Sequence, residues 1–421
     1  MKILVIGSGG REHAIAWKLS KSPDKPELYC VPGNAGIAQV AKCESGRSDD
    51  PEGLARLAGK LKVDLTFVGP EAPLVAGIAE SFAERRLRLV GPSRKAARLE
   101  GSKVFAKQFM ARHSVPTARF RIADSPELAR QLAEREFDFP LVIKADGLAA
   151  GKGVVVASNR EEFEDAINRT MVQHAFGDAG SRVVIEECLV GTEASLMLFT
   201  DGHDYQAVAP ARDYKRVDDA DKGPNTGGMG SFSTPGLIDD VMMSQIRARI
   251  VEPTLQGMSV EGTPFHGILY VGLMLTTDGP FVIEYNARLG DPETQAVLMR
   301  MDSDLVETCE AIVNGRVASS RVEWSSDSSV CLVLASGGYP GAFEKNKVIS
   351  GLECARDVEG VVVFHAGTTL GSKGECLTSG GRVLGVTARA ASLQEARERA
   401  YRAAGMISFD NMHFRRDIAL R

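Results

Sequence analysis

The sequence lacks the features of several large protein classes. Its seven cysteines are scattered and form no CxxC pair, which argues against a zinc site and suits a reducing compartment. The net charge of −5 argues against a general nucleic-acid binder. No apolar run reaches the ~18 residues that a membrane helix needs, and the N-terminal MKILVIGSGG is too short and too glycine-rich for a signal peptide. We therefore expect a cytoplasmic protein with no nucleic-acid and no membrane partner.

Two common nucleotide-binding motifs are also missing. A Walker A loop needs glycine and then serine or threonine at the positions held by Asp146 and Gly153. A dinucleotide fingerprint needs a third glycine where Glu12 stands, and no acid ends the second expected strand, so a dehydrogenase is disfavoured. A phosphate or sugar held by backbone amides at the start of the first helix, beside Arg11, remains open.

The length and composition predict a soluble protein of several domains. At 421 residues the chain is too long for one ordinary core, and 44% hydrophobic with 25% charged residues is typical of globular proteins. Residues 1–101 alternate short apolar strands with helices, one of them expected over Ala76–Arg86. This pattern predicts a parallel sheet with ligands at the carboxyl ends of its strands. The serine-rich stretch Arg316–Ser329 is a candidate linker before a last α+β segment.

The middle of the chain predicts strands and helices in mixed order. Ile268–Thr276 and Phe281–Tyr285 predict an antiparallel hairpin, and Leu237–Gln256 predicts a helix. A strand is expected over Val208–Asp213. The polar stretch Tyr214–Ser231 follows it and predicts a long loop that is mobile or covers a ligand.

The most informative stretch is Pro140–Val156. Two short apolar runs, Leu141–Ile143 and Val154–Val156, predict two strands joined by a glycine-rich loop. Such a loop lets backbone N–H groups approach an anion, and Lys144 and Lys152 add positive charge. The stretch is therefore either a phosphate-binding hairpin or a flexible hairpin without a ligand.

The second informative stretch is FVIEYNARLGDPE, residues 281–293. On a strand, Glu284 and Asn286 point to the same face, and Arg288 continues that face if the strand does. Carboxylate and amide oxygens suit Mg²⁺, which binds through few protein groups and keeps phosphate oxygens and water as other ligands. The arginine could hold a carboxylate or stabilise developing charge. An exposed strand face with one surface ion pair is the simpler alternative.

Two further features are weaker. An apolar strand runs into Glu186 and Glu187, with Glu193 after a turn; the strand edge could bind a flat base and a carboxylate could bind ribose hydroxyls. Taken alone, solvated surface acids are the favoured interpretation of this stretch. The seven histidines show no metal spacing, and His13 on the first helix is interpreted as a partly buried, hydrogen-bonded residue. No local signature of a Ser–His or Cys–His nucleophile is found.

Taken together, these stretches resemble the ATP-grasp superfamily, and the whole chain is similar to its phosphoribosylamine–glycine ligase (glycinamide ribonucleotide synthetase) family. The strings that carry the resemblance are GGREHA at 9–14, VGPEAPLV at 68–75, LEGSK at 99–103, IKADGLAAGKGV at 143–154, AFGDAG at 175–180, GPNTGGMG at 223–230, NARLGDPETQ at 286–295, GGYPG at 337–341, FHAGT at 364–368 and GGRVL at 380–384. Together they are highly specific, although no single string is.

The resemblance implies a multidomain α/β and α+β fold. Its parts are a pre-ATP-grasp α/β domain at 1–101, an ATP-grasp domain at 102–316 with a mobile lid at about 117–190, and a C-terminal α+β domain at 317–421. It implies ligation of glycine to 5-phosphoribosylamine in purine biosynthesis, with ATP as a substrate, Mg²⁺ or Mn²⁺ as the metal and glycyl phosphate as the intermediate. We expect a monomer. A non-catalytic ATP-binding protein on the same fold, or a sister ligase for another carboxylate, remains an alternative.

The resemblance also implies roles for single residues. The nucleotide would be held by Lys103, Lys144, Gly147, Gly151, Lys152, Gly153, Glu186, Glu187, Leu189 and Glu193. The metal would be held by Glu284 and Asn286. The catalytic group would be Arg288, Asp213 and Asp291, with the arginine on the acyl phosphate and the two acids near glycine or the amine. Phosphoribosylamine would be held by Gly9, Gly10, Glu71 and Arg382.

Overall fold

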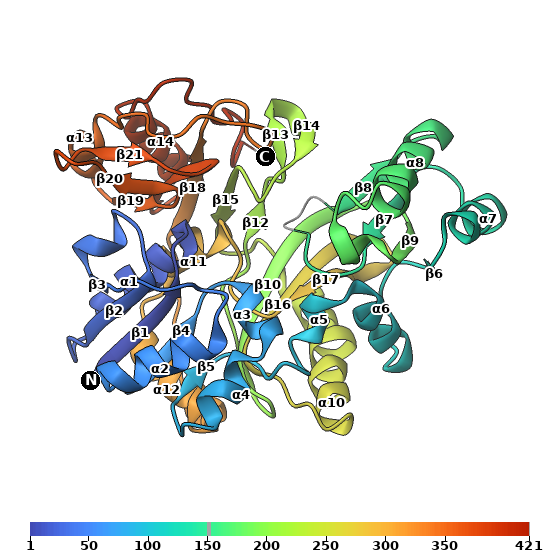
Figure 1. Cartoon of the computed structure of the whole chain (residues 1–421), viewed down its shortest axis with the longest axis horizontal. Coiled ribbons are helices and arrows are strands. Elements are labelled where there is room, and N and C mark those ends of the chain that lie inside the picture. The colour runs from blue at the N-terminus through green and yellow to red at the C-terminus, as the bar shows by residue number, and fades with distance from the viewer. Residues whose placement is uncertain (150–152, 421) are drawn as a thin grey trace.

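The computed structural model describes residues 1–149 and 153–420. The chain begins with a five-stranded parallel sheet in the order β3-β2-β1-β4-β5 (Figure 1). Its strands are β1 (Lys2–Gly7), β2 (Glu27–Pro32), β3 (Lys42–Cys43), β4 (Leu65–Val68) and β5 (Leu89–Val90). The helices of this part are α1 (Gly10–Ser20), α2 (Pro51–Leu61), α3 (Glu71–Ala76) and α4 (Ile78–Ala83). The predicted parallel sheet is confirmed.

The helix expected near Ala76–Arg86 is confirmed as the shorter α4, but the short helix α3 before it was not expected. The two helices meet at Gly77, which has a φ of +93°. Glycine adopts this left-handed conformation without steric cost, so it ends α3 and redirects the chain into α4.

The central body is built on an antiparallel sheet in the order β11-β10-β16-β17. Its strands are β10 (Thr192–Asp201), β11 (Tyr205–Ala207), β16 (His266–Thr276) and β17 (Gly279–Asn286). The predicted hairpin of β16 and β17 is confirmed. The helices are α5 (Arg98–Gly101), α6 (Lys103–Arg112), α9 (Asp240–Ile246), α10 (Glu252–Val260), α11 (Glu293–Arg300) and α12 (Leu305–Val313). A π-helical turn, Arg247–Val251, joins α9 to α10 within the expected helix.

The segment predicted to be a lid, residues 117–190, stands at one side of the molecule (Figure 1), and we refer to it by that name. Its sheet has the order β6-β9-β7-β8 and is antiparallel throughout. The elements are β6 (Phe120–Ala123), α7 (Pro126–Glu136), β7 (Leu141–Ala145), β8 (Val154–Ala157), α8 (Arg160–Ile167) and β9 (Val183–Glu187). The pairing of β7 with β8 confirms the hairpin predicted from the two apolar runs.

The last sheet draws strands from two distant parts of the chain. Its order is β12-β15-β18-β22-β19, from β12 (Arg212–Asp213), β15 (Gly230–Ser233), β18 (Ser328–Ala335), β22 (Arg382–Ala390) and β19 (Val361–His365). Around it lie α13 (Leu352–Arg356), β20 (Thr368–Leu370), β21 (Cys376–Thr378) and α14 (Leu393–Ala404).

Two predictions fail in this region. The expected strand Val208–Asp213 is wrong, since the strands lie at 205–207 and 212–213. The long loop over Tyr214–Ser231 is also wrong, because this segment contains the hairpin of β13 (Arg216–Asp218) and β14 (Lys222–Asn225) and enters β15.

Helix α11 lies where the first domain, the central sheet and the last sheet come together. All eight of its residues are buried, and it packs against α1 of the first domain and against β15, β18 and β22 of the last sheet (Figure 1). The segment before α11 carries the predicted residues Asn286, Arg288 and Asp291, so this packing fixes where they lie. Among the described helices, none has the length and apolar character to cross a bilayer.

Candidate active site

The lid and the central body meet at a buried group of lysines. Lys144 on β7 donates from Nζ to the carbonyl of Ile283 at 2.8 Å and pairs with Glu186 on β9 at 3.0 Å. Lys107 of α6 reaches the same carboxylate at 2.8 Å. Burial lowers the pKa of Lys107 to about 8, and Lys144 adds to that shift. Two cations around one carboxylate leave net positive charge here, which suits a phosphate.

The Glu186 side chain therefore has a partner that the sequence did not suggest. The side chain is 2% exposed and lies between two lysines. This geometry does not favour contact between the Glu186 carboxylate and adenine. Its neighbour Glu187 accepts from the Arg119 N–H at 2.7 Å, and Leu189 is half-buried. An adenine site on this strand would use backbone groups and Leu189 rather than the Glu186 carboxylate.

Both ends of the loop between β7 and β8 are held by hydrogen bonds. Lys103 donates from Nζ to the Gly147 carbonyl at 2.8 Å, and Gly147 has a φ of +106° that favours glycine. The Gly153 carbonyl accepts from the Ala145 N–H at 2.8 Å. Gly151 and Lys152, both predicted to cover the nucleotide phosphates, lie outside the described residues.

Glu284 and Asn286 lie on the same face of β17, as the sequence predicted. Lys215 lies 3.7 Å from Glu284 and 3.1 Å from Glu193. Burial alone would raise the pKa of Glu284, but Lys215, Lys144 and Lys103 hold it below its usual value. The side chain of Glu284 is 36% exposed, so an ionised carboxylate faces open space beside an amide oxygen.

This donor set fits a hard divalent cation. Within the described residues there is no group of three or more His, Cys, Asp and Glu side chains that could hold a metal by itself. Mg²⁺ in phosphoryl-transfer sites is bound by one or two carboxylates together with substrate phosphates and water. Glu284 and Asn286 supply that kind of partial shell, next to the lysines that suit the phosphates.

Asp213, on β12, faces a crowded set of charges. Burial raises the pKa of its carboxyl, and the neighbouring carboxylates Glu293, Glu193 and Glu284 raise it further, while Lys215 opposes them. Lys215 in turn keeps a pKa well above its usual value because these carboxylates outweigh its own burial. Asp213 is therefore a carboxyl that can hold a proton near neutral pH.

Arg288 is fixed between two acids from other elements. Its guanidinium pairs with Glu71 of α3 at 3.2 Å and with Glu100 of α5 at 2.9 Å. It also donates to the Asn286 Oδ1 at 3.4 Å. Burial opposes the charge, but Glu100 and Glu71 raise the pKa of Arg288, so the side chain stays cationic. Glu71 thus lies on Arg288, beside the metal-ligand candidates.

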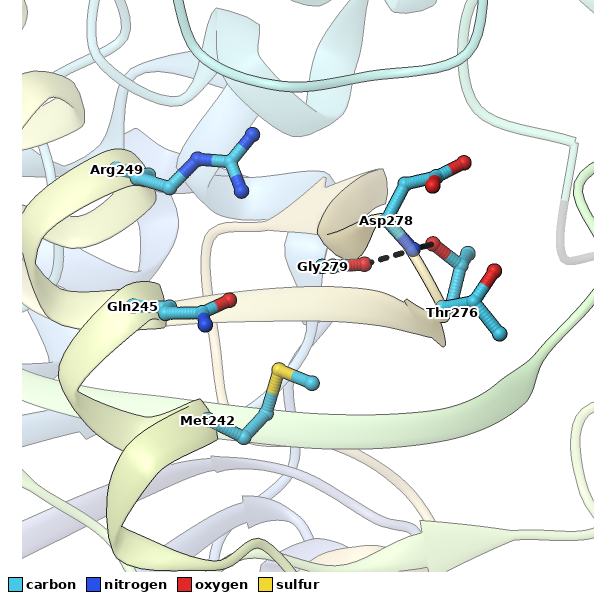
Figure 2. Close-up of a pocket in the computed structure, with 7 residues that line it drawn as sticks. Met242, Gln245, Arg249, Thr276, Asp278 and Gly279 are labelled. Carbon is cyan, nitrogen blue, oxygen red and sulfur yellow. Dashed lines mark hydrogen bonds between the residues drawn. The ribbon is translucent and has the colours of Figure 1, made fainter.

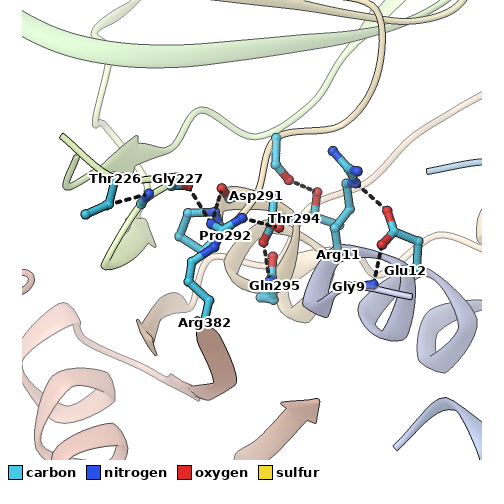
Figure 3. Close-up of polar contacts among 12 residues, drawn as sticks. Gly9, Arg11, Glu12, Thr226, Gly227, Asp291, Pro292, Thr294, Gln295 and Arg382 are labelled. Atoms are coloured by element: carbon cyan, nitrogen blue, oxygen red, sulfur yellow. Dashed lines mark hydrogen bonds and ion pairs between the residues drawn. The ribbon is translucent and has the colours of Figure 1, made fainter. Parts of the chain in front are cut away.

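Asp291 and Arg382 join the central body to the last domain. Arg382 on β22 donates to the Asp291 backbone carbonyl at 2.9 Å and to its carboxylate at 2.8 Å, and it also contacts the Gly227 carbonyl (Figure 3). Asp291 accepts from Gln295 at 2.8 Å. Burial would raise the pKa of Asp291, but Arg382 and Arg11 lower it, so this acid stays ionised.

The glycine turn of the first domain lies against this group. The Gly9 N–H donates to Glu12 at 2.6 Å, which explains why an acid stands where a dinucleotide fingerprint has glycine (Figure 3). A Cβ placed on Gly10 would lie 2.6 Å from Gln295 Nε2, and one on Gly9 would lie 3.9 Å from Asp291. The turn, Asp291 and Arg382 therefore lie close together, although they come from three domains.

Two surface hollows lie elsewhere. The larger, of 410 Å³, is an open hollow between α9 and the turn from β16 to β17 (Figure 2). Its lining residues are Met242, Gln245, Arg249, Thr276, Thr277, Asp278 and Gly279. The smaller, of 170 Å³, is lined by His113, Pro253, Gln256, Gly257 and Val260. Neither hollow is lined by a predicted site residue. The candidate active site is therefore located by the contacts among its predicted residues and not by a hollow.

Comparison with known proteins gives a match for each part of the chain. Models of the phosphoribosylglycinamide synthetase family match residues 1–100 (N domain), 101–294 (ATP-grasp, or A, domain) and 329–421 (C domain). A phosphoribosylamine–glycine ligase from Vibrio parahaemolyticus is 49% identical over 425 residues, which is 100% of this chain and 98% of the relative. The chain belongs to the phosphoribosylglycinamide synthetase family.

Solved structures agree with this membership. A phosphoribosylamine–glycine ligase from Thermotoga maritima has a TM-score of 0.85 and 35% identity, covering 99% of this chain and 100% of its own. A biotin carboxylase from Campylobacter jejuni, at 16% identity and a TM-score of 0.73, covers 98% of this chain and 92% of its own and shares the fold alone. The family resemblance and the multidomain fold predicted from the sequence are confirmed.

Three residues that contact the candidate site were missed from the sequence. Lys107 looks like an ordinary helix lysine, and only the fold brings it to Glu186. Glu100 lies in the LEGSK string, which carried the resemblance but not a role for the acid. Lys215 follows Asp213 at a spacing that places both on one face of an extended segment, and this spacing could have revealed it.

Proposed function

We propose that this chain joins glycine to 5-phosphoribosylamine at the expense of ATP. The products are glycinamide ribonucleotide, ADP and phosphate, and the step belongs to purine biosynthesis. The observation that carries the proposal is Arg288. It is a fixed cation 3.4 Å from the metal-ligand candidate Asn286 and paired with Glu71 of the first domain. A group in that position can serve both the phosphate and the amine halves of the reaction.

In the first half of the reaction, a glycine carboxylate oxygen attacks the γ-phosphorus of ATP. The bond from the γ-phosphorus to its bridging oxygen breaks, and ADP leaves. We assign nucleotide binding to Lys103, Lys144, Gly147, Gly151, Lys152, Gly153, Glu187, Leu189 and Glu193, with Glu186 acting through the two lysines. Mg²⁺ or Mn²⁺ held by Glu284 and Asn286 would neutralise phosphate charge.

In the second half, the amine nitrogen of phosphoribosylamine attacks the carbonyl carbon of glycyl phosphate. The carbon–oxygen bond to phosphate breaks, and the amine loses a proton. Arg288 stabilises the negative charge that develops on the acyl phosphate. We assign proton acceptance to the ionised form of Asp213, because a pKa raised by burial and by neighbouring acids makes this carboxylate a stronger base than an ordinary one. Asp291, locked on Arg382, orients the substrate instead.

Phosphoribosylamine is assigned to the junction of the first and last domains. Gly9 and Gly10 offer a close backbone approach, Glu71 lies on Arg288, and Arg382 offers positive charge. We also propose the domain limits 1–101, 102–316 and 317–421, a lid that closes over ATP, and a cytoplasmic monomer. The family matches at 1–100, 101–294 and 329–421 support the limits.

The test is release of ADP in the presence of freshly made phosphoribosylamine. Glycine, the amine and the divalent metal are omitted in turn, and the product is identified by mass spectrometry. ADP and glycinamide ribonucleotide should form only in the complete mixture. ADP formed with another carboxylate in place of glycine would point to a sister ligase, and binding of ATP without turnover would point to a non-catalytic protein.

A further inference from the structure

Two buried histidines connect the first and last domains. His13 on α1 and His365 at the end of β19 are 5% and 1% exposed. The backbone N–H of His365 donates to Nδ1 of His13 at 2.7 Å, and the two ring centroids lie 5.6 Å apart. A Cβ placed on Gly36 would lie 2.4 Å from His13 and 2.5 Å from His365, so the pair is tightly enclosed.

The hydrogen bonds determine the state of the His13 ring. A backbone N–H can only donate, so Nδ1 of His13 must be without a proton. On the other ring, Nε2 of His365 lies 3.3 Å from Arg356, which can only donate, and Nδ1 lies 3.1 Å from Thr368 Oγ1. Both rings are therefore neutral. Burial, His365 and Arg356 also lower the pKa of His13 to about 3, in agreement with this assignment.

The loop held by His13 is bonded directly to the segment that carries Arg382. After His365 the chain turns, and the Gly367 N–H donates to the Arg382 carbonyl at 2.9 Å. The Ala366 N–H donates to the Val383 carbonyl at 2.9 Å. The Arg382 side chain then reaches Asp291 at 2.8 Å (Figure 3).

On its other side, His13 belongs to the helix that begins at the glycine turn. The His13 N–H donates to the Gly9 carbonyl at 3.0 Å, and a Cβ placed on Gly10 would lie 3.6 Å from Ala366. His13 thus lies one helical turn after Gly9 and Gly10. It is also hydrogen-bonded to the loop that packs against Arg382. The hydrogen bond from His365 to His13 therefore links the glycine turn to the Arg382 segment.

We propose that His13 is a positioning residue for phosphoribosylamine. Its Nδ1 holds the 365–367 loop, and this sets the distance between the Gly9–Gly10 turn and Arg382. The inference rests on the proposed function, which places the amine substrate between those groups. His13 does not touch substrate; it acts through the backbone of His365 and Gly367.

The experiment compares two replacements of His13 in the full chain. His13→Leu fills similar space without an acceptor, whereas His13→Asn places an amide oxygen close to the position of Nδ1. We expect His13→Leu to raise the KM for phosphoribosylamine on the order of tenfold, as loss of one buried hydrogen bond implies, with the KM values for ATP and glycine within about twofold. His13→Asn should restore most of the loss.

A second variant approaches the same loop from the other side. Asn34 donates from Nδ2 to the carbonyls of His365 and Ser8, each at 2.8 Å, while its Oδ1 accepts from Gly36 and Ile37. Asn34→Asp keeps the acceptor and loses the donor, so it should also raise the KM for phosphoribosylamine selectively. It serves as the test if His13→Leu does not fold, and the exposed His203→Leu is the matched control.

The outcomes separate the two claims. An inactive wild-type protein overturns the proposed function, and this inference falls with it. An active wild type whose variants raise all three KM values alike, or leave them unchanged, overturns the inference alone. The inference also fails if His13→Asn behaves as His13→Leu does, because the acceptor would then not be the property that matters.

Discussion

Arg288 illustrates how much of the site depends on single residues. Its place two residues beyond Asn286 was enough to suggest a role in stabilising charge. The sequence could not show that Glu71 and Glu100 hold its guanidinium, because those acids come from other elements. Glu100 also accepts from the Ala287 N–H at 2.7 Å, so it fixes both the backbone and the side chain of this segment.

Replacement of Arg288 should affect catalysis more than nucleotide binding. Arg288→Ala is expected to lower kcat by about 10²–10³-fold, because a preorganised charge at the acyl phosphate is lost. The KM for ATP should stay within about twofold. Steady-state ADP release at varied ATP, glycine and amine checks this.

Two companion variants support the Arg288 measurement. Arg288→Lys keeps the charge but loses the planar fork that pairs with two acids, so an intermediate kcat is expected. Removing the arginine alone leaves Glu100 buried without its partner, so Arg288→Met combined with Glu100→Gln tests whether instability explains the loss. A raised KM for ATP with unchanged kcat would assign Arg288 to nucleotide binding instead.

At the scale of elements, local patterns predicted most helices and strands. The β7–β8 hairpin, for example, followed from two apolar runs. The strands β13, β14 and β15 were missed because polar residues and glycine fill them. β13 and β14 pair with each other, whereas β15 pairs with β12 and with β18, which lies far along the chain. Pairing of that kind leaves no local periodicity to detect.

The contact between α1 and β19 should be sensitive to acid. Burial lowers the pKa of His13 from 6.5 to about 3, and His365 and Arg356 contribute. The unfolded chain therefore takes up the proton first. The stability that a neutral His13 contributes is present above about pH 6.5 and is lost as the pH falls toward 3. The pKa of His365, lowered to about 4 by burial and by Arg356, acts in the same direction.

Urea unfolding at two pH values measures this effect. Between pH 7.5 and pH 5, the free energy of unfolding of the wild type should fall by about 2 kcal/mol more than that of His13→Leu. His203→Leu, on an exposed turn, should follow the wild type. Parallel losses in the wild type and in His13→Leu would show that other groups account for the acid sensitivity.

At the scale of the whole molecule, the sheets differ in how self-contained they are. Among the described residues, the lid core draws only on the lid, from Ala123 to Val183 and Ile185. The last sheet instead takes β12 and β15 from the middle of the chain. The order of the domains could be predicted from the sequence. The sharing of one sheet between distant segments arises only when the chain folds, and the composition of the candidate linker Arg316–Ser329, whose last two residues begin β18, did not indicate it.

Two fragments should therefore behave differently. Residues 117–190 contain every strand of their sheet and should unfold cooperatively in urea, as followed by circular dichroism. Residues 329–421 carry almost all of β18, whose eight residues are all buried, but they lack β15, so an apolar edge is left unpaired. We expect this fragment to aggregate or to show no cooperative transition. Cooperative unfolding of 329–421 as a monomer would contradict the expected dependence on β15.

The same shared sheet constrains the order of events during protein synthesis. The lid can close its sheet as soon as β9 has left the ribosome, whereas β15 must wait for its partner β18, which lies much later in the chain. Until then β15 offers an open edge in an incomplete chain, a state in which strands are prone to wrong pairing. Its sequence, Gly-Ser-Phe-Ser, is short and poor in apolar residues. An unpaired strand of this composition is a weak template for aggregation. The polar composition that made β15 hard to predict from the sequence therefore also protects the nascent chain.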